Sequence, residues 1–278
     1  MKLVLWFVVC FVSIYIKNSK AHKQKCAGVH VNGKFHRKEI LTNGVNRPYQ
    51  LAYYHHEHLL YFSYNVGDDD EDKFEIGYLH LRKNQKIPTS VPAIKNGFAT
   101  ALDENNKLLY LGGSDGIFVD NLNKSGGVEH VIKGHNVWDM FFREHLYFIE
   151  YPSQRLHKKT HNSSELVEHI DEKIYQFAVD GDNDIFITTK DGLREIKNGT
   201  KERISYDGPD AYRAIEIDRK GVAHFCAKSS IYVANKVNHT LEEIAHVKNI
   251  FGLAFDKDNN IIYSDPHEIV KLLPENCK

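Results

Sequence analysis

Several side chains, each at the same place in a repeated unit, have the chemistry to hold a flat aromatic molecule. Five are aromatic and one is arginine: Tyr49, Phe98, Trp138, Tyr175, Phe251 and Arg213. Two further basic residues, Arg47 and Lys173, each lie two residues before one of these positions. Aromatic faces stack on conjugated rings, and arginine and lysine pair with carboxylates or lie over ring faces. The set favours non-covalent binding of a planar, conjugated, acidic ligand.

Three other interpretations of these positions stay open. Large rings at repeated positions also serve as packing between neighbouring units. The polar residues just before them could hold a divalent ion, as in a calcium-dependent lactonase or esterase: Asn96, Asn136, Asp210 and Asn249. That set has a single carboxylate, so we expect a binding protein without a catalytic residue, metal or cofactor. An extracellular interaction protein that takes no small ligand is the third alternative.

The segment His55 to His58, with three histidines and Glu57, has metal-binding residue types. It falls at the expected tight turn between two strands, where alternation points neighbouring side chains apart. We therefore expect a solvated turn there. The sequence contains no phosphate-binding loop, no His-Glu-x-x-His pair and no Cys-x-x-Cys pair.

The elements that must position these residues are visible as a repeat. The clearest copies are GFATALDENNKLLYL (97–111), IYQFAVDGDNDIFIT (174–188) and IFGLAFDKDNNIIYS (250–264). Each has an aromatic residue, an apolar strand that ends at Asp, a polar turn and a second apolar strand. Weaker copies occur at 48–63, 137–150 and 211–226. A period of about forty residues with four short strands is typical of propeller blades. The chain is therefore predicted to be an all-β, six-bladed propeller.

The last copy ends near Cys277, before a fourth strand could form. The N-terminal segment VNGKFHRKEIL (31–41) has the turn and strand needed to complete that blade, which would close the ring and remove its open edges. A disulfide between Cys26 and Cys277 would then lock the closure. Cys226, inside an apolar run, is expected to be a buried small hydrophobic residue.

Four Asn-x-Ser/Thr sequons occur in the chain, at Asn123, Asn162, Asn198 and Asn238. All four fall in the expected turn between the third and fourth strands of a blade, on the outer rim. Glycans need exposed loops, so this phase predicts a glycoprotein. The acidic run 67–73 is expected to enlarge an early hairpin as a solvated loop.

The apolar run 3–16 behind Met1 and Lys2 has the length and place of a signal-peptide core. We expect a signal peptide over residues 1–21 and a mature, secreted chain of one domain over 22–278. The whole chain has a formal net charge of −1 and no clustered basic footprint, which gives no support for a nucleic-acid partner. No second stretch is apolar enough to predict a membrane partner, and we expect a monomer.

The mature chain resembles the ommochrome-binding proteins of moths and butterflies. The likeness is carried by CAGVHVNGKFHRKEIL (26–41), RPYQLAYY (47–54), GFATALDENNKLLYLGGSDGIFVDN (97–121), KIYQFAVDGDNDIFI (173–187) and FDKDNNIIYSDP (255–266). The resemblance implies secretion into haemolymph and binding of ommochromes, planar pigments derived from tryptophan, for transport or storage. It assigns no binding residue.

Overall fold

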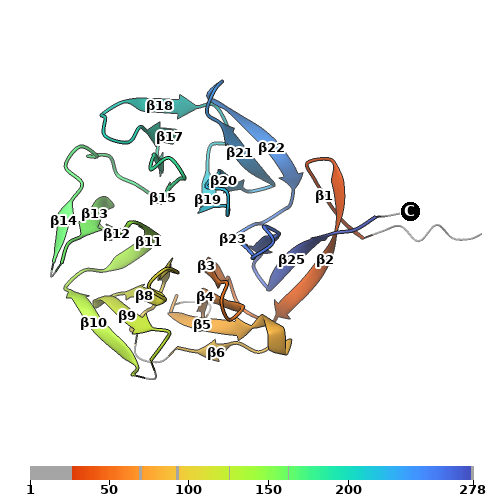
Figure 1. Ribbon diagram of the computed structural model, residues 1–278, viewed down its shortest axis with the longest axis horizontal. Coiled ribbons are helices and arrows are strands. Elements are labelled where there is room, and N and C mark those ends of the chain that lie inside the picture. Colours follow the sequence, from red (N-terminus) through yellow and green to blue (C-terminus); the bar gives the residue numbers. More distant parts are fainter. Residues whose placement is uncertain (1–26, 69–70, 92–93, 125, 162, 277–278) are drawn as a thin grey trace, which may run out of the picture.

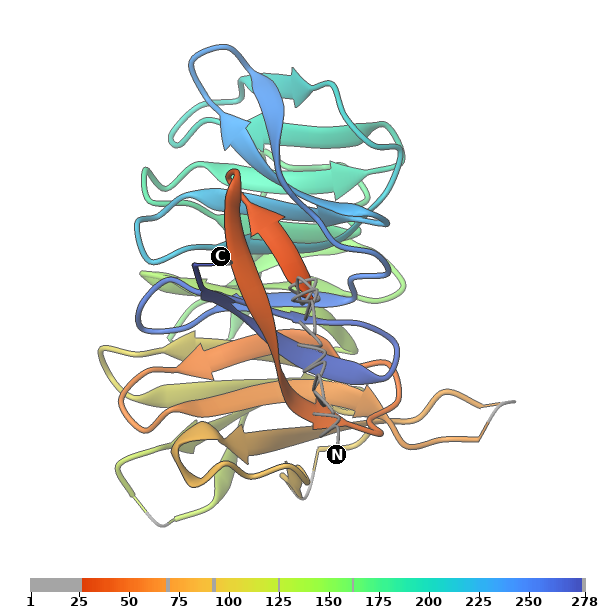
Figure 2. The ribbon, with the colours of Figure 1, turned by 90° about the vertical axis from the view of Figure 1, so that its right-hand side faces the viewer.

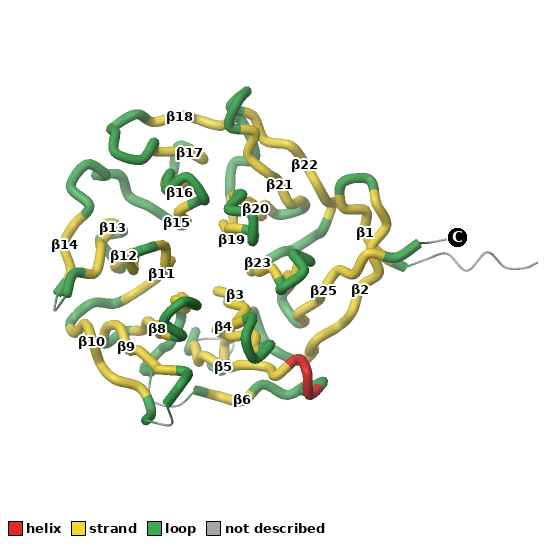
Figure 3. Tube along the Cα trace, viewed as in Figure 1, coloured by secondary structure: helices red, strands yellow, loops and turns green. Residues whose placement is uncertain are grey.

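Antiparallel strands account for almost all regular structure of the chain. The computed structural model describes residues 27–68, 71–91, 94–124, 126–161 and 163–276. Within these residues lie 25 strands and one short 3-10 helix, η1 (Leu81–Lys83). Viewed down the shortest axis, the sheets form a ring around a common centre (Figure 1), and the tube drawing shows how little of the path is helical (Figure 3).

Four of the sheets each contain four strands that follow one another in the chain. The first is β3 (Tyr49–Tyr54), β4 (Leu59–Asn65), β5 (Phe74–His80) and β6 (Thr89–Ser90). The second is β7 (Ala99–Asp103), β8 (Leu108–Gly113), β9 (Gly116–Asn121) and β10 (Val128–Lys133). The third is β11 (Val137–Arg143), β12 (His145–Glu150), β13 (Arg155–Lys159) and β14 (Ser164–Leu166). The fourth is β15 (Gln176–Val179), β16 (Ile185–Thr189), β17 (Gly192–Ile196) and β18 (Arg203–Tyr206).

The remaining strands form one nine-stranded sheet. In spatial order it contains β19 (Tyr212–Ile217), β20 (Ala223–Ala227), β21 (Ser230–Asn235), β22 (Thr240–His246), β1 (Gly28–Val31), β2 (Lys34–Asn43), β25 (Glu268–Pro274), β24 (Ile261–Ser264) and β23 (Gly252–Phe255). The link between β22 and β1 is a single pair, Val31 with Ala245.

The N-terminal strand β2 lies along the last strand, β25. Their antiparallel register runs from His36 opposite Pro274 to Asn43 opposite Glu268. Figure 2 shows β1 and β2 side by side with β25, although they come from opposite ends of the chain. The pairing expected between the N-terminal segment and the last repeat is therefore present.

The first strand of every repeat lies at the centre of the ring (Figure 1). Consecutive first strands β3, β7, β11, β15, β19 and β23 contact one another, and β23 contacts β3 in turn. Strand β10 and its equivalents in later sheets, β14, β18 and β22, lie at the periphery. This arrangement is that of a β-propeller.

The recurring aspartate at the end of the first strand has a structural reason. It is buried in four repeats, as Asp103, Asp180, Asp218 and Asp256. In the fourth sheet, Asp180 Oδ1 accepts hydrogen bonds from the N–H groups of Asp182 and Asp184, both at 2.9 Å. An aspartate that binds the backbone of the next residues fixes a tight turn. The repeat in the sequence is therefore a repeat of turns.

The three described sequon asparagines, Asn123, Asn198 and Asn238, are exposed in turns between third and fourth strands, as predicted. Asn162, the pair Cys26 and Cys277, and the predicted signal peptide 1–21 lie outside the described residues. Cys226 is completely buried in β20. In the described part of the chain, no helix is long and apolar enough to span a membrane.

Candidate functional site

A cavity of about 870 Å³ occupies the centre of the ring. Its walls come from the first strands of the repeats, and these strands all run in the same direction through the ring. Residues that begin the strands therefore meet at one end of the cavity, and residues that end them meet at the other. We call these the aromatic end and the His55 end, after the side chains described below.

Ring contacts at the aromatic end form a continuous row. Tyr49 stacks on Phe251 with centroids 4.9 Å apart and an interplanar angle of 5°. Phe98 stacks on Trp138 at 4.9 Å and 19°, and Tyr49 lies 5.5 Å from Phe98. The guanidinium carbon of Arg213 lies 4.9 Å from the centroid of Phe251. All five residues line the cavity.

These contacts show that packing between neighbouring strands is one role of the aromatic positions. The inner rings already cover one another, and the end of the row is more open, with Trp138 44% exposed. Tyr151, which is 50% exposed, lies 5.7 Å from Trp138. Sequence reasoning missed Tyr151 because it follows a second strand. The short β11–β12 hairpin, which pairs Val137 with Glu150, could have indicated it.

Arg47 also lines the cavity, but its positive charge is shared. Its guanidinium forms an ion pair with Asp72, which lies in the enlarged connection between β4 and β5. Arg213 has no carboxylate partner among the described residues and keeps its cation over the ring of Phe251. Arg213 is therefore the more available cation of the two.

Two predicted residues are placed elsewhere. Tyr175 and Lys173 precede β15, as expected, but are not among the described residues that line the cavity. Tyr175 is 45% exposed, and Lys173 is exposed. In this repeat, Gln176 and Phe177 form the wall instead. The structure thus brings six of the eight predicted binding residues to one cavity: Arg47, Tyr49, Phe98, Trp138, Arg213 and Phe251.

Two acidic residues line the middle of the cavity. Asp139 accepts hydrogen bonds from the N–H of Met140 at 2.9 Å and of Phe177 at 3.3 Å. Burial raises the pKa of Asp139 to about 7. Burial also raises the pKa of Glu216 to about 8, and the Asp139 carboxyl adds to that shift. Protonated carboxyls at neutral pH can donate hydrogen bonds to a ligand as well as accept them.

The other end of the cavity carries His55, Glu104 and Arg219. His55 Nε2 lies 3.3 Å from Glu104 Oε1, and Arg219 Nη1 lies 3.8 Å from Glu104 Oε2. Burial lowers the pKa of His55 to about 4 and raises the pKa of Glu104. The prediction of a wholly solvated histidine turn was wrong for His55, because the β3 strand turns its side chain into the cavity. His56 and Glu57 are exposed as expected.

The polar positions considered for a divalent ion do not converge. Asn96 and Asn136 line the cavity, whereas Asp210 and Asn249 are not among the described lining residues. The Oδ1 of Asn96 accepts a hydrogen bond from the N–H of Phe74 at 2.9 Å. Among the described residues, groups of three His, Cys, Asp or Glu side chains close enough to share an ion occur only outside the cavity.

One short segment matches the Gly-x-Ser-x-Gly spacing of hydrolase nucleophiles, at residues 112–116. It forms the tight hairpin between β8 and β9, with Gly113 paired to Gly116. A nucleophile elbow instead joins a strand to a helix. Ser114 also does not line the cavity. The match therefore gives no support for a hydrolase site.

Comparison with known proteins finds a relative by sequence and solved structures that are similar in fold. No protein-family model matches the chain. An ommochrome-binding protein from Manduca sexta is 31% identical over 254 residues, which cover 89% of this chain and 91% of that protein. A gluconolactonase from Xanthomonas campestris has a TM-score of 0.69 at 12% identity, covering 90% of this chain and 96% of its own. A virginiamycin B lyase from Staphylococcus aureus has a TM-score of 0.58 at 13% identity, covering 86% and 99%.

The two solved structures share the fold alone, since their identity to this chain is so low. Fold and cavity together define a β-propeller with a central, aromatic-lined chamber. The extent and identity of the match to the Manduca sexta protein place the chain more narrowly: it belongs to the family of ommochrome-binding proteins.

Proposed function

We propose that this protein binds an ommochrome pigment, non-covalently, at the aromatic end of the central cavity. The observation that carries the proposal is the row of rings from Phe251 to Trp138, which ends in exposed aromatic faces and begins under the cation of Arg213. The name of the relative from Manduca sexta supports the same class of ligand.

The cavity has the size and polarity that such a ligand requires. Its volume of about 870 Å³ is within the range of small-molecule sites. A conjugated ring system can stack against Trp138 and Tyr151, whose faces are about half exposed. Carboxylates of the pigment can pair with Arg213 and, in exchange for Asp72, with Arg47. Tyr175 and Lys173 contribute, in this arrangement, only through a part of the ligand that projects beyond the cavity.

The surrounding architecture is proposed to be that of a six-bladed propeller. The nine-stranded sheet then counts as two blades, β19 to β22 and β23 to β25 with β2, bridged by β1. Gly28 and Leu273 both pair with Arg37, from opposite sides of β2, so the two ends of the described chain lie in one sheet with a single strand between them. We propose on this ground that Cys26 and Cys277 form a disulfide.

We propose further that residues 1–21 are removed and that the domain 22–278 is secreted as a monomer into haemolymph for pigment transport or storage. Exposed turns at Asn123, Asn198 and Asn238 support glycosylation there, and Asn162 has the same sequence phase.

Titration of xanthommatin, an ommochrome, into pigment-free secreted protein tests the function. Saturable one-to-one binding with a change in the visible absorption band is expected. Trp138→Ala is expected to weaken binding about tenfold or more, because loss of a stacking face costs roughly 1–3 kcal/mol. Trp138→Phe keeps an aromatic face and is expected to retain most of the affinity. Absence of binding in the parent protein would overturn the function, and equal affinity in Trp138→Ala would overturn the assignment of the site.

A further inference from the structure

Two histidines and a glutamate converge at the third sheet and the connection that leads into it, outside the cavity walls. His135 lies between β10 and β11, Glu150 ends β12, and His157 lies within β13. His135 Nδ1 is 3.0 Å from Glu150 Oε1, and His157 Nε2 is 3.6 Å from Glu150 Oε2. Potential ligand atoms of the three side chains all lie within 4.8 Å of one another. The three side chains therefore face a common point.

His157 is the most informative member of this group. It is only 8% exposed, and its Nε2 has no hydrogen-bond partner among the described residues. A buried polar atom without a partner is costly and rare in folded proteins. Two zinc ligands at 2.0 to 2.1 Å in tetrahedral geometry lie about 3.4 Å apart. The 3.6 Å between His157 Nε2 and the Glu150 carboxylate is close to that separation.

Other contacts hold the three side chains in place. Ser164 Oγ lies 3.3 Å from His135 Nε2, the ring nitrogen that faces away from the carboxylate. Ser153 Oγ donates a hydrogen bond to Glu150 Oε2 at 3.0 Å. Polar partners of this kind orient metal ligands. The nearby guanidinium of Arg155 opposes a cation, but it donates to a backbone carbonyl, and the glutamate supplies a negative charge.

Aromatic packing fixes the two imidazoles as well. The completely buried ring of Phe148 stacks on His157 with centroids 5.0 Å apart and an angle of 15°. The same ring meets His135 edge-on at 5.4 Å. Preset rings lose little conformational freedom when they bind an ion, so the geometry is available without rearrangement.

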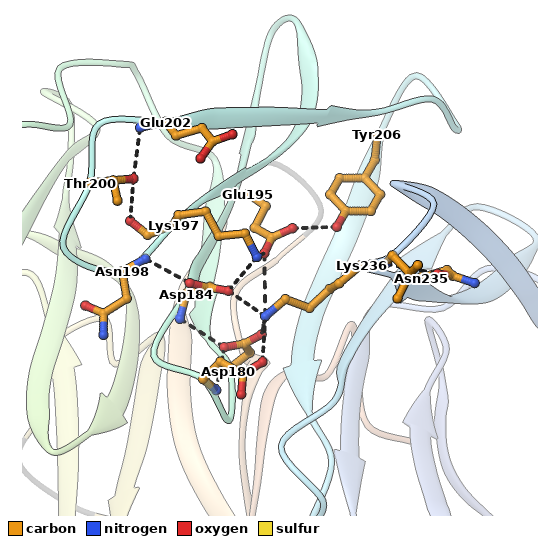
Figure 4. Close-up of polar contacts among 12 residues, drawn as sticks. Asp180, Asp184, Glu195, Lys197, Asn198, Thr200, Glu202, Tyr206, Asn235 and Lys236 are labelled. Carbon is orange, nitrogen blue, oxygen red and sulfur yellow. Dashed lines mark hydrogen bonds and ion pairs between the residues drawn. The ribbon is translucent and has the colours of Figure 1, made fainter.

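A second group of side chains is also close enough together to hold an ion: Asp180, Asp182 and Asp184. This group already binds a cation of the protein itself. The ammonium of Lys236 lies 2.7, 2.9 and 2.5 Å from these three carboxylates, and Glu195 lies beyond at 3.5 Å. Figure 4 shows Lys236 reaching into this cluster from a neighbouring segment. The aspartates thus form an ion-pair network between β15–β18 and the β21–β22 turn. Among the described residues, no such lysine reaches the histidine group.

We propose that His135, Glu150 and His157 bind a divalent transition-metal ion of the zinc class. Imidazole nitrogen and carboxylate oxygen are ligands that such ions prefer, and a further position stays open to water. His135 and Glu150 adjoin Asn136 and Tyr151, which line the cavity. The ion therefore cross-links β12 and β13 of the third sheet to the β10–β11 connection, beside the aromatic end.

Calorimetric titration of zinc into the secreted protein, after dialysis against a chelator, tests the site. One-to-one binding is expected, with affinity reduced at least tenfold in His157→Gln and in Glu150→Gln. His145→Gln is the matched control: His145 is exposed on β12 of the same sheet, outside the cluster, and the variant is expected to bind zinc as the parent does. Asp182→Asn is likewise expected to leave zinc binding unchanged.

Cobalt(II) provides a second measurement, because its visible absorption reports nitrogen and oxygen ligation directly. The parent is expected to develop a saturable band that Glu150→Gln, which keeps the size of the side chain, loses. Circular dichroism of each variant separates loss of the site from loss of the fold. Absence of a one-to-one site in the parent, or equal zinc affinity in the parent and Glu150→Gln, would overturn the proposal.

Discussion

The two ends of the central cavity are built by opposite ends of the same strands and differ in chemistry. At the aromatic end, Tyr49 stacks on Phe251, and the guanidinium of Arg213 lies over the ring of Phe251. At the His55 end, the imidazole pairs with Glu104, which Arg219 also approaches. The aromatic end thus offers a row of ring faces and a cation that has no carboxylate partner among the described residues, whereas at the His55 end the cation of Arg219 is paired with Glu104 beside a neutral imidazole.

This difference gives the cavity a direction. At the aromatic end, a flat acidic ligand finds a row of stacked rings beside a cation that has no carboxylate partner among the described residues. Between the ends, ionised Asp139 and Glu216 would repel a carboxylate. Burial raises the pKa of Glu216 to about 8, which keeps it largely neutral near pH 7, and raises the pKa of Asp139 to about 7, which leaves it about half protonated there. The acidic groups of the pigment are therefore expected to stay at the aromatic end while its apolar or donor groups extend inward.

The largest expected effect concerns the carboxyl between the two ends, Glu216. Its pKa rises from 4.5 to about 8 on folding, so the unfolded chain ionises first as pH rises. This contribution to the free energy of unfolding is fully present below pH 4.5 and is lost as pH rises through 8. Glu216→Gln removes that loss and is therefore expected to be more stable than the parent at pH 9. The difference in the free energy of unfolding is expected to be on the order of 2 kcal/mol, since water in the cavity reduces the cost of burying the carboxylate.

Urea denaturation of the parent and Glu216→Gln at pH 5 and pH 9 measures this difference. The glutamine can still accept the hydrogen bond that Glu216 Oε1 takes from the N–H of Ile217 at 2.8 Å, so the backbone contact is preserved. Similar stabilities are expected at pH 5. Parallel pH dependences of the two proteins would show that folding does not raise the pKa of Glu216 and that its carboxylate is ionised in the cavity at neutral pH.

The next effect compares two arginines of one segment, Arg213 in β19 and Arg219 just after it. Arg213→Gln is expected to weaken xanthommatin binding about tenfold, because a charge-assisted hydrogen bond contributes roughly 1.5–3 kcal/mol. Arg219→Gln, at the His55 end, is expected to change the affinity less than twofold. Fluorescence or absorption titration of both variants measures the ratio. Equal losses in the two variants would mean that the cavity has no preferred end.

The aromatic end was largely predictable from the sequence, and the His55 end was not. The repeat fixes the phase of each first strand, and a row of large side chains at one phase meets at one end. Phase does not fix which neighbouring residue faces inward: Gln176, not Tyr175, lines the wall in the fourth sheet. Local sequence therefore locates the ring of residues but not each side chain.

Pairs such as His55 with Glu104 escape sequence reasoning for another reason. The two residues belong to neighbouring repeats and follow different strands, so only the packing of β3 against β7 brings them together. The histidine group in the third sheet is similar, since its members are far apart in the repeat and meet through the register of β12 and β13. The register between the strands of one blade depends on how the strands pack, so the period of the repeat in the sequence does not determine it.

The smallest expected effect lies at the His55 end. Burial lowers the pKa of His55 from 6.5 to about 4, so the unfolded chain takes up a proton first as pH falls from 6.5 towards 4. The free energy of unfolding therefore decreases over that pH window. The decrease is about 1 kcal/mol, since the side chain is only half buried. The raised pKa of Glu104 acts in the opposite direction, and His55→Gln isolates the histidine. Urea denaturation at pH 7.5 and pH 5 is expected to show that the variant loses less stability on acidification than the parent. Pigment affinity at pH 7.5 is expected to be unchanged. An identical loss of stability in the two proteins would show that His55 titrates freely and that the His55 end is open to water.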